Sequence, residues 1–379
     1  MGLSDEIAFM GRAIALAWRS RGHTRPNPPV GAVVVNGGRI VGEGRHVRCG
    51  GDHAEVAALK SVHRHGGETR GATVYVTLEP CSRPGRVGAC CDALIAAGVR
   101  KVVWALPDPN PKNAGRAARI LARAGIVTEC WGRARRGTAR RMCADESRAL
   151  IAPFAKHVTT GMPFVTVKIA MSLDGRICDD WGDARWVSSE RARRITGTLR
   201  EMVDVIMVGA ETLRRDNPSL LSHGRRNDDL FRAVVTRSGR LPPDAQVFTD
   251  AARERTIVFC IGRCTGSMSA RTVKARDLRS ALKRLGEMGF MHVLCEGGLE
   301  LARSLAAEGM VDEWLAVVAP KVIGHAHIGD AVRIPHFRLM ADGLRYRSCR
   351  SDMSWPGSNE RGRPTWPSTD SITIPEKGE

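Results

Sequence analysis

The alternation of short apolar runs with helical segments constrains the fold of this chain more than any other feature of its sequence. Three Val-rich runs in the first part have the length and the β-branched content of buried strands: "VGAVVV" (30–35), "ATVYVTL" (72–78) and "KVVWAL" (101–106). Helices are predicted between and after them, near 53–64, 89–97 and 114–124. This order predicts a mostly parallel sheet with helices on both faces.

A second α/β pattern follows a polar stretch that ends in proline, "AKHVTTGMP". Six runs are predicted strands: 164–171, 203–209, 231–236, 255–260, 291–298 and 313–324. Helices are expected near 189–201, 277–288 and 299–309. We therefore expect a first domain over 1–148, a linker over 149–163, a second domain over 164–350 and a disordered tail over 351–379, which is rich in Pro, Ser, Gly and charge.

Composition narrows the class of protein. No window approaches the apolar length of a membrane span, and the N-terminus patterns as an amphipathic helix with early acids rather than as a signal peptide. We therefore expect a cytoplasmic protein without a membrane partner. The 11 cysteines are odd in number and irregularly spaced, which argues against a disulfide framework and leaves a subset free to bind metal.

The net charge of +18 favours anionic partners, either nucleic acid or phosphorylated small molecules. The basic residues are scattered along the chain, as in a solvated surface, and the 5% aromatic content offers few stacking platforms for single-stranded nucleic acid. We therefore expect a phosphorylated small molecule and no nucleic-acid partner.

Two short motifs predict a zinc site. "HAEVAALK" (53–60) opens a helix with a His-x-Glu pair, and "TLEPCSRPGRVGACCDALIAAG" (77–98) places one cysteine after a strand and another at a helix start. His53, Cys81 and Cys90 supply three ligands and leave the fourth tetrahedral position of a catalytic zinc for water. Glu55 is then the proton shuttle, as in zinc-dependent nucleobase deaminases. Cys91 adjoins Cys90 and is the alternative ligand.

With these motifs in view, the chain resembles the bifunctional deaminase–reductase family of riboflavin biosynthesis up to about residue 350. The segments that carry the resemblance are "RPNPPVGAVVV", "HAEVAAL", "YVTLEPCS", "CCDALIAAGV", "DPNP", "KIAMSLDGR", "DNPSL", "EGG" and "VDEWLAVVAPKVIG". The resemblance implies an N-terminal cytidine-deaminase-like three-layer domain followed by a dihydrofolate-reductase-like α/β domain. It implies zinc and NADPH as cofactors, a phosphorylated pyrimidine substrate and a homo-oligomer.

The resemblance also implies roles for single residues. His53, Cys81 and Cys90 would bind zinc, Glu55 would donate the proton, and Asn27 would help hold the pyrimidine. In the second domain the cofactor positions are Ala170, Trp186, Thr212, Asp216, Ser238 and Gly298. The substrate positions are Lys168, Ser172, Asp174, Ala184, Arg200, Leu220 and Glu296, with Arg200 expected to pair with the substrate phosphate because its planar fork suits an oxyanion.

The chain departs from the family pattern between the two zinc cysteines. Arg83 and Pro84 replace a usual histidine pair, and Val87, Gly88 and Ala89 replace a usual Thr-Pro-Pro. A specialised relative, which diverts the same pyrimidine into another heterocycle, would fit these changes.

The sequence is therefore compatible with two classes of function. The first is a bifunctional enzyme that deaminates a pyrimidine nucleotide with zinc and then reduces its ribosyl group to ribityl with NADPH. The second is an RNA or nucleoside deaminase with a basic partner domain, which the net charge motivates. NADPH binding separates the two classes.

Overall fold

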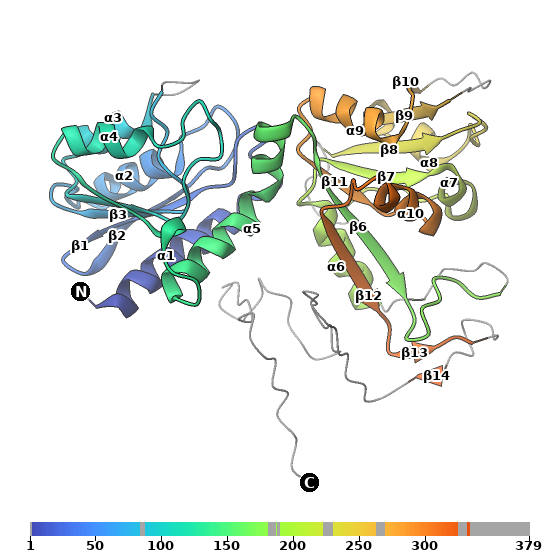
Figure 1. Cartoon of the computed structure of the whole chain (residues 1–379), viewed down its shortest axis with the longest axis horizontal. Helices are drawn as coiled ribbons and strands as arrows, with labels where there is room; N and C mark the ends of the chain where they lie inside the picture. Colours follow the sequence, from blue (N-terminus) through green and yellow to red (C-terminus); the bar gives the residue numbers. More distant parts are fainter. Residues whose placement is uncertain are drawn as a thin grey trace, which may run out of the picture.

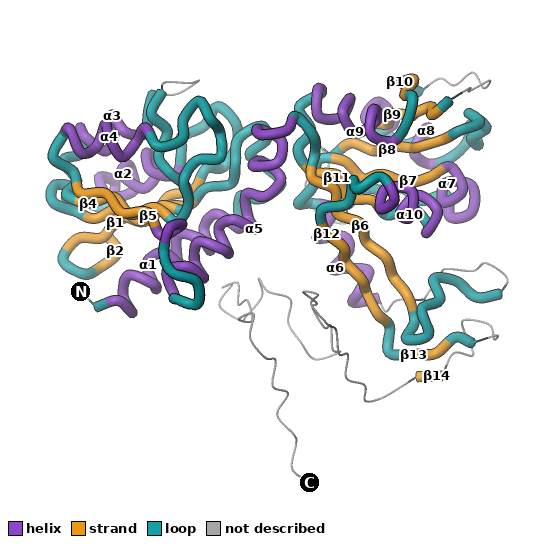
Figure 2. Tube along the Cα trace, in the orientation of Figure 1, coloured by secondary structure: helices purple, strands orange, loops and turns teal. Residues whose placement is uncertain are grey.

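The computed structural model describes residues 2–83, 88–180, 187, 190–222, 230–262, 270–324 and 332–333. Figure 1 shows two α/β domains joined by the long helix α5. Each domain has a central sheet with helices on both of its faces (Figure 2), and the expected α/β fold class is confirmed.

The first domain is built on a five-stranded sheet of order β2-β1-β3-β4-β5. Its strands are β1 (Gly31–Asn36), β2 (Arg39–Arg45), β3 (Thr73–Val76), β4 (Lys101–Trp104) and β5 (Val127–Cys130). Its helices are α1 (Leu3–Trp18), α2 (Ala54–Arg64), α3 (Cys90–Ala96), α4 (Arg116–Arg123) and α5 (Ala139–Thr160), with a short 3₁₀ turn, η1 (Trp131–Arg133).

Alternation along the strands gives this sheet two apolar faces. Val74 and Val76 of β3 join the cluster that covers α2, α3 and α4, whereas Tyr75 between them joins the cluster of α1 and α5. Successive side chains of a strand point to opposite faces, so the sheet is the middle of three layers.

The first sheet is mixed, so the prediction of a mostly parallel sheet is wrong for this domain. β1 is antiparallel to β2 and to β3, whereas β3, β4 and β5 are parallel. β2 was not recognised because "RIVGEGR" has no apolar run; its two glycines lie where a Cβ would collide with the backbone of α2. Gly37 and Gly38, both with positive φ, form the tight turn from β1 to β2.

The second domain carries a seven-stranded, wholly parallel sheet of order β10-β9-β8-β7-β11-β6-β12. The strands are β6 (Phe164–Met171), β7 (Val205–Gly209), β8 (Phe231–Thr236), β9 (Thr256–Ile261), β10 (Arg271–Ala275), β11 (His292–Cys295) and β12 (Glu313–Val318). The helices are α6 (Glu190–Arg200), α7 (Ala210–Asp216), α8 (Gln246–Thr249), α9 (Leu278–Glu287) and α10 (Leu299–Ala307), with the 3₁₀ turn η2 (Arg253–Arg255). A two-stranded piece consists of β13 (Lys321–Val322) and β14 (Val332–Arg333).

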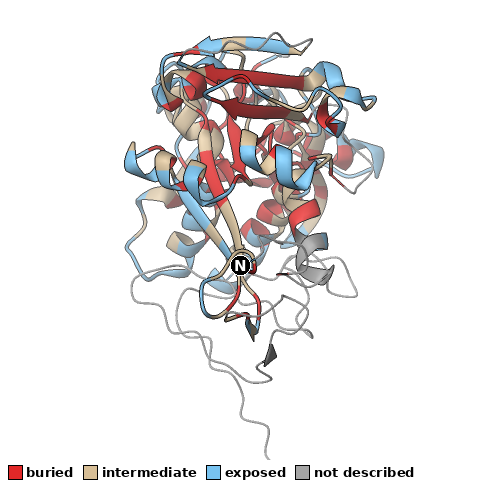
Figure 3. Ribbon diagram, turned by 90° about the vertical axis from the view of Figure 1, so that its right-hand side faces the viewer, coloured by how far each residue is buried: buried red, intermediate tan, exposed pale blue. Residues whose placement is uncertain are grey.

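Buried residues follow the strands and the inner faces of the helices, as the red segments of Figure 3 show. One cluster of the second domain combines Val165, Met207 and Phe259 with α9 and α10, and the other combines Ile206, Val234 and Val258 with α7 and α8. All but one of the predicted strands and helices of the second domain therefore correspond to single elements; the run 313–324 divides into β12 and β13.

The expected linker differs from the structure. Residues 149–160 continue α5, which ends at Gly161 in the left-handed conformation (φ 73°) and leaves only a few residues before β6. Thr138 caps the start of this helix by accepting a hydrogen bond from the Arg141 amide. The predicted tail over 351–379 lies outside the described residues.

The two domains are in contact. Arg25 of the first domain lies over the ring of Phe290 at 4.7 Å and 4.0 Å from the carboxylate of Asp204. Lys156 of α5 donates a hydrogen bond of 2.5 Å to Asp312. Among the described helices, none has both the length and the apolar character that crossing a bilayer requires.

Candidate functional site

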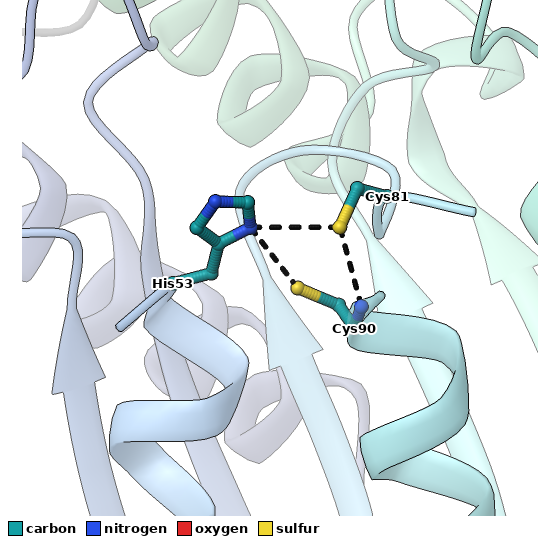
Figure 4. Close-up of side chains that lie close together, drawn as sticks. All are labelled: His53, Cys81 and Cys90. Carbon is teal, nitrogen blue, oxygen red and sulfur yellow. Dashed lines mark hydrogen bonds between the residues drawn. The ribbon is translucent and has the colours of Figure 1, made fainter. Parts of the chain in front are cut away.

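The three predicted zinc ligands converge at the edge of the first sheet (Figure 4). His53 is the N-cap of α2, Cys90 is the first residue of α3, and Cys81 lies in the loop after β3. The Nδ1 atom of His53 lies 3.2 Å from Sγ of Cys90 and 3.5 Å from Sγ of Cys81. All three donor atoms lie within 4.8 Å of one another, as a single tetrahedral ion requires.

The surroundings favour an anionic thiol at Cys81. A hydrogen bond from the Cys90 thiol, together with one from His53, lowers the pKa of Cys81 to about 4. The backbone amide of Cys90, at the start of α3, also donates to Sγ of Cys81 at 3.2 Å. Two sulfur donors and one imidazole nitrogen form the donor set that zinc prefers, so the residues fit this ion.

Cys91 lies in a different environment from Cys90. Its side chain is fully buried in the apolar cluster of α2, α3 and β3, and burial raises its pKa to about 12. Cys91 is not a member of the three-residue group. The structure therefore favours Cys90 over Cys91 as the third ligand.

Glu55 lies next to the ligand group, in the first turn of α2. It is 4% exposed, and burial followed by the negative charge of Cys81 raises its pKa to about 7. Its side chain also shares a hydrogen bond with Cys90. A carboxyl group with a pKa near neutrality, beside a group of residues that could hold a metal ion, can both accept and donate a proton.

Asn27 reaches the same site through a histidine that the sequence did not single out. Its Nδ2 atom lies 3.0 Å from Nε2 of His46, and Nδ1 of His46 lies 2.9 Å from the carbonyl of Asp52. The His46 ring packs edge-on against the His53 ring, with 5.2 Å between centroids. A pocket of about 280 Å³ opens beside them, lined by residues of both helix starts, among them His53, Ala89 and Asp92.

Two further residues that sequence reasoning missed hold the loop of Cys81. Glu79 is 4% exposed and accepts hydrogen bonds from the amide of Asp108, in the loop after β4, and from the amides of Gly115 and Ala117, at the start of α4. Asn113 accepts from the amide and hydroxyl of Ser82 at 2.8 and 2.7 Å. In the sequence, only the charge of Glu79 next to Pro80-Cys81 and the "DPNP" segment (108–111) indicated that these residues support the Cys81 loop.

The predicted cofactor and substrate positions of the second domain gather at one edge of its sheet. Ala170 lies near the end of β6 and Ser172 follows that strand, Thr212 and Asp216 lie on the helix after β7, Ser238 follows β8, and Glu296 and Gly298 follow β11. Because these strands are parallel, their carboxyl ends meet at this edge, where ligands of open α/β sheets bind. Ala184 and Trp186 lie outside the described residues.

Three substrate positions form a charged cluster. Arg200 and Glu296 make a two-pronged pair, with Nε–Oε1 at 2.8 Å and Nη2–Oε2 at 2.9 Å. Burial lowers the pKa of Lys168, and the charge of Glu296 acts against that shift. In the structure Arg200 therefore has a carboxylate partner, and its expected pairing with a substrate phosphate stays a prediction.

The other predicted positions have local partners. Asp174 accepts hydrogen bonds from the amides of Ile323 and Gly324. A hydrogen bond from Ser172 is the largest contribution that lowers the pKa of Asp174 to about 2, and these two amides lower it further. Gly298, the N-cap of α10, donates to the Thr212 hydroxyl at 3.2 Å. Ser238 and Asp216 are exposed.

The comparisons with known proteins cover both domains. The cytidine and deoxycytidylate deaminase zinc-binding region matches residues 3–106, and the RibD C-terminal domain matches residues 163–340. The Riboflavin biosynthesis protein RibD of Escherichia coli is 35% identical over 365 residues, which cover 91% of this chain and 95% of that protein. The protein of the same name from Aquifex aeolicus is 34% identical, over 85% of this chain and 89% of its own length.

Solved structures agree with these matches. Acinetobacter baumannii RibD is similar with a TM-score of 0.74 and 34% identity, covering 91% of this chain and 94% of that chain. A diaminohydroxyphosphoribosylaminopyrimidine deaminase/5-amino-6-(5-phosphoribosylamino)uracil reductase from Thermotoga maritima has a TM-score of 0.74 and 33% identity, covering 86% of this chain and 89% of that chain.

Proposed function

Because the chain belongs to the RibD family of bifunctional deaminase–reductases of riboflavin biosynthesis, we propose that its two sites act in sequence on one phosphorylated pyrimidine. The first would deaminate a diaminopyrimidinone ribosylamino phosphate, and the second would reduce its ribosyl group to ribityl. The zinc-binding deaminase domain and the reductase domain imply zinc and NADPH. The observation that carries this proposal is the group of His53, Cys81 and Cys90 beside the buried Glu55.

In the deaminase site, His53, Cys81 and Cys90 would hold the zinc ion. Zinc, when bound, supplies a water of lowered pKa at the fourth position. Glu55 would take a proton at its buried carboxyl group and return it to the leaving amine, and its pKa of about 7 suits both transfers. Asn27 would hold the pyrimidine, in an orientation that its contact with His46 fixes.

In the reductase site, Lys168 on β6, Arg200 at the end of α6 and Glu296 just after β11 would bind the substrate. NADPH would lie along Ala170, Thr212, Asp216, Ser238 and Gly298, with the start of α10 near its pyrophosphate. NADPH supplies the hydride; these side chains supply orientation and charge. Arg200 uses three of its five N–H groups on Glu296 and the Leu221 carbonyl, which leaves two for a phosphate.

The finer identity of the substrate is part of this proposal. Residues 84–87, in the segment that departs from the family pattern, lie outside the described residues, so the specialised-relative interpretation stays a prediction. The cytoplasmic location, the homo-oligomer and the absence of nucleic-acid and membrane partners also stay predictions.

NADPH oxidation tests the order of the two reactions. The protein should oxidise NADPH with the already deaminated substrate whether or not the zinc site is intact. With the aminated substrate, oxidation should need an intact zinc site and disappear in Cys81→Ser. Oxidation that is indifferent to the substrate's amino group would contradict the proposal, and failure to bind NADPH would favour an RNA or nucleoside deaminase.

A further inference from the structure

Arg232 on β8 is a fully buried charged residue that the proposed mechanism does not use. Its Nε donates a hydrogen bond to the Thr256 hydroxyl at 3.0 Å, and its two terminal nitrogens donate to the carboxylate of Asp250 at 2.6 and 2.9 Å. The remaining two N–H groups donate to the carbonyls of Ser219 at 3.0 Å and Val247 at 2.9 Å. All five donors of the guanidinium are satisfied, so Arg232 has none left for a ligand.

The Ser219 carbonyl belongs to a strained segment. Asn217 has a φ of 38° and Leu220 a φ of 56°, and these are the only non-glycine residues with positive φ in the described ranges. The left-handed region is unfavourable for a branched side chain such as that of Leu220. Leu220 is only 2% exposed and packs in the apolar cluster of α7 and α8, so its conformation is set from several sides.

Hydrogen bonds hold this segment at both ends. At one end, the Asn217 side chain accepts a hydrogen bond from the Gln246 amide at 2.8 Å, and the Asn217 carbonyl accepts one from the Gln246 side chain at 2.9 Å. At the other end, the Leu221 carbonyl accepts from Arg200 at 2.9 Å, and Arg200 makes the two-pronged pair with Glu296. The strained residue Leu220 therefore lies between the carbonyls of Ser219 and Leu221. The first accepts a hydrogen bond from Arg232 and the second accepts one from Arg200.

We propose that Arg232, with Asp250 as its counter-ion, is a positioning residue of the reductase site. It fixes the Ser219 carbonyl, which keeps Leu220 in its left-handed conformation and sets the Leu221 carbonyl that orients Arg200 toward Glu296. Strained backbone persists only where its surroundings over-determine it, so loss of the Arg232 contacts lets the segment relax. The functional part of this inference rests on the proposed reductase.

Steady-state kinetics separate positioning from mere stabilisation. The variants are Asp250→Asn and Arg232→Lys, and the matched control is Arg284→Lys on α9, where Arg284 makes an exposed pair with Glu287. Lysine keeps the charge but lacks the planar fork, so Arg232→Lys should raise the reductase KM for the deaminated substrate about tenfold or more, with a smaller change in kcat. Asp250→Asn should raise KM less, and the control and the deaminase activity should match the wild type.

Hydrogen–deuterium exchange tests the geometry without substrate. Both variants should exchange faster over 217–222 and at the residues around Arg200, whereas strands β7 and β9 should keep wild-type protection. If Arg232→Lys does not fold, the KM of Asp250→Asn and its hydrogen–deuterium exchange over 217–222 test the proposal instead.

Wild-type KM with a lower melting temperature in the folded variants would overturn the proposal, because Arg232 would then only stabilise the domain. Parallel loss of deaminase and reductase activity would overturn it as well. If the wild type does not reduce the substrate, the proposed function fails, and local exchange at 217–222 still decides whether Arg232 positions the segment.

Discussion

The Nδ1 atom of His53 lies 3.2 Å from Sγ of Cys90, and this contact joins the starts of two helices that lie 37 residues apart in the sequence. Both residues sit at helix N-termini, and the backbone amide of Cys90 there donates a hydrogen bond to Sγ of Cys81 at 3.2 Å. The next residue, Cys91, turns its thiol into the apolar core. Two adjacent cysteines of the same helix turn are therefore expected to respond differently to the same substitution.

Cys90→Ala should release zinc and abolish deamination, because only two protein ligands would remain. Cys91→Ala should keep zinc and lower the free energy of unfolding by about 1 kcal/mol, since it removes a single buried sulfur atom. Metal analysis of the purified proteins, with urea unfolding of each, measures both effects. A zinc-loaded Cys90→Ala protein beside a zinc-free Cys91→Ala protein would reverse the assignment.

Glu55→Gln should retain zinc and lose deaminase activity by roughly a hundredfold to ten-thousandfold, the usual contribution of a general acid–base. Gln has nearly the same shape but cannot exchange a proton, so binding should change little. Glu68→Gln, at an exposed position of the same domain, is the matched control and should be fully active. Deaminase rates at fixed zinc loading measure the effect, and an active Glu55→Gln protein would remove Glu55 from the mechanism.

Arg200→Met should lower both reductase activity and stability. Glu296, whose side chain is 9% exposed, would lose both hydrogen bonds to Arg200 and keep only the charge of nearby Lys168, at a cost of about 3 kcal/mol. The double variant Arg200→Met/Glu296→Gln should regain most of the stability but none of the activity. Thermal unfolding and NADPH oxidation of the three proteins test this. A double variant that regains activity would show that the pair is structural only.

His292 should make stability depend on pH. It is buried, with 5% of its surface exposed, and burial followed by the charge of Arg21 lowers its pKa from 6.5 to about 3. The unfolded chain takes up a proton near pH 6.5 while the folded protein does not, so its contribution is fully present above pH 6.5 and is lost as the pH falls toward 3. The slope is about 1.4 kcal/mol per pH unit in that window.

Unfolding at pH 7 and pH 5 measures this dependence. His292→Gln, which can keep the hydrogen bond to Thr166, should be less sensitive to the pH change than the wild type. His63→Gln, at an exposed position, should keep the wild-type difference. Equal pH dependence in all three proteins would show that His292 is not the source.

The apolar pattern predicted most strands and helices because burial decides them. It did not predict β2, whose place depends on glycines packed against α2, nor the short elements β5, β10, α7 and α8. It ended the first domain inside α5, because the polar stretch "AKHVTTGMP" at the end of that helix resembles a linker. Motif spacing identified His53, Glu55, Cys81 and Cys90. It did not identify Glu79, His46 or Arg232, whose importance comes from contacts that only the fold creates. For the same reason, the pair of Arg200 with Glu296 could not be predicted.

Mass spectrometry of the products tests the central claim most directly. The purified protein, with zinc and NADPH, is incubated with the diaminopyrimidinone ribosylamino phosphate. The account predicts first a product in which a hydroxyl (as its keto tautomer) replaces the amino group, and then a product that has also gained a hydride and a proton at the ribosyl group. With Glu55→Gln neither should accumulate, whereas the deaminated substrate should still be reduced. A reduced product that keeps its amino group, or no product from either form of the substrate, would contradict the account.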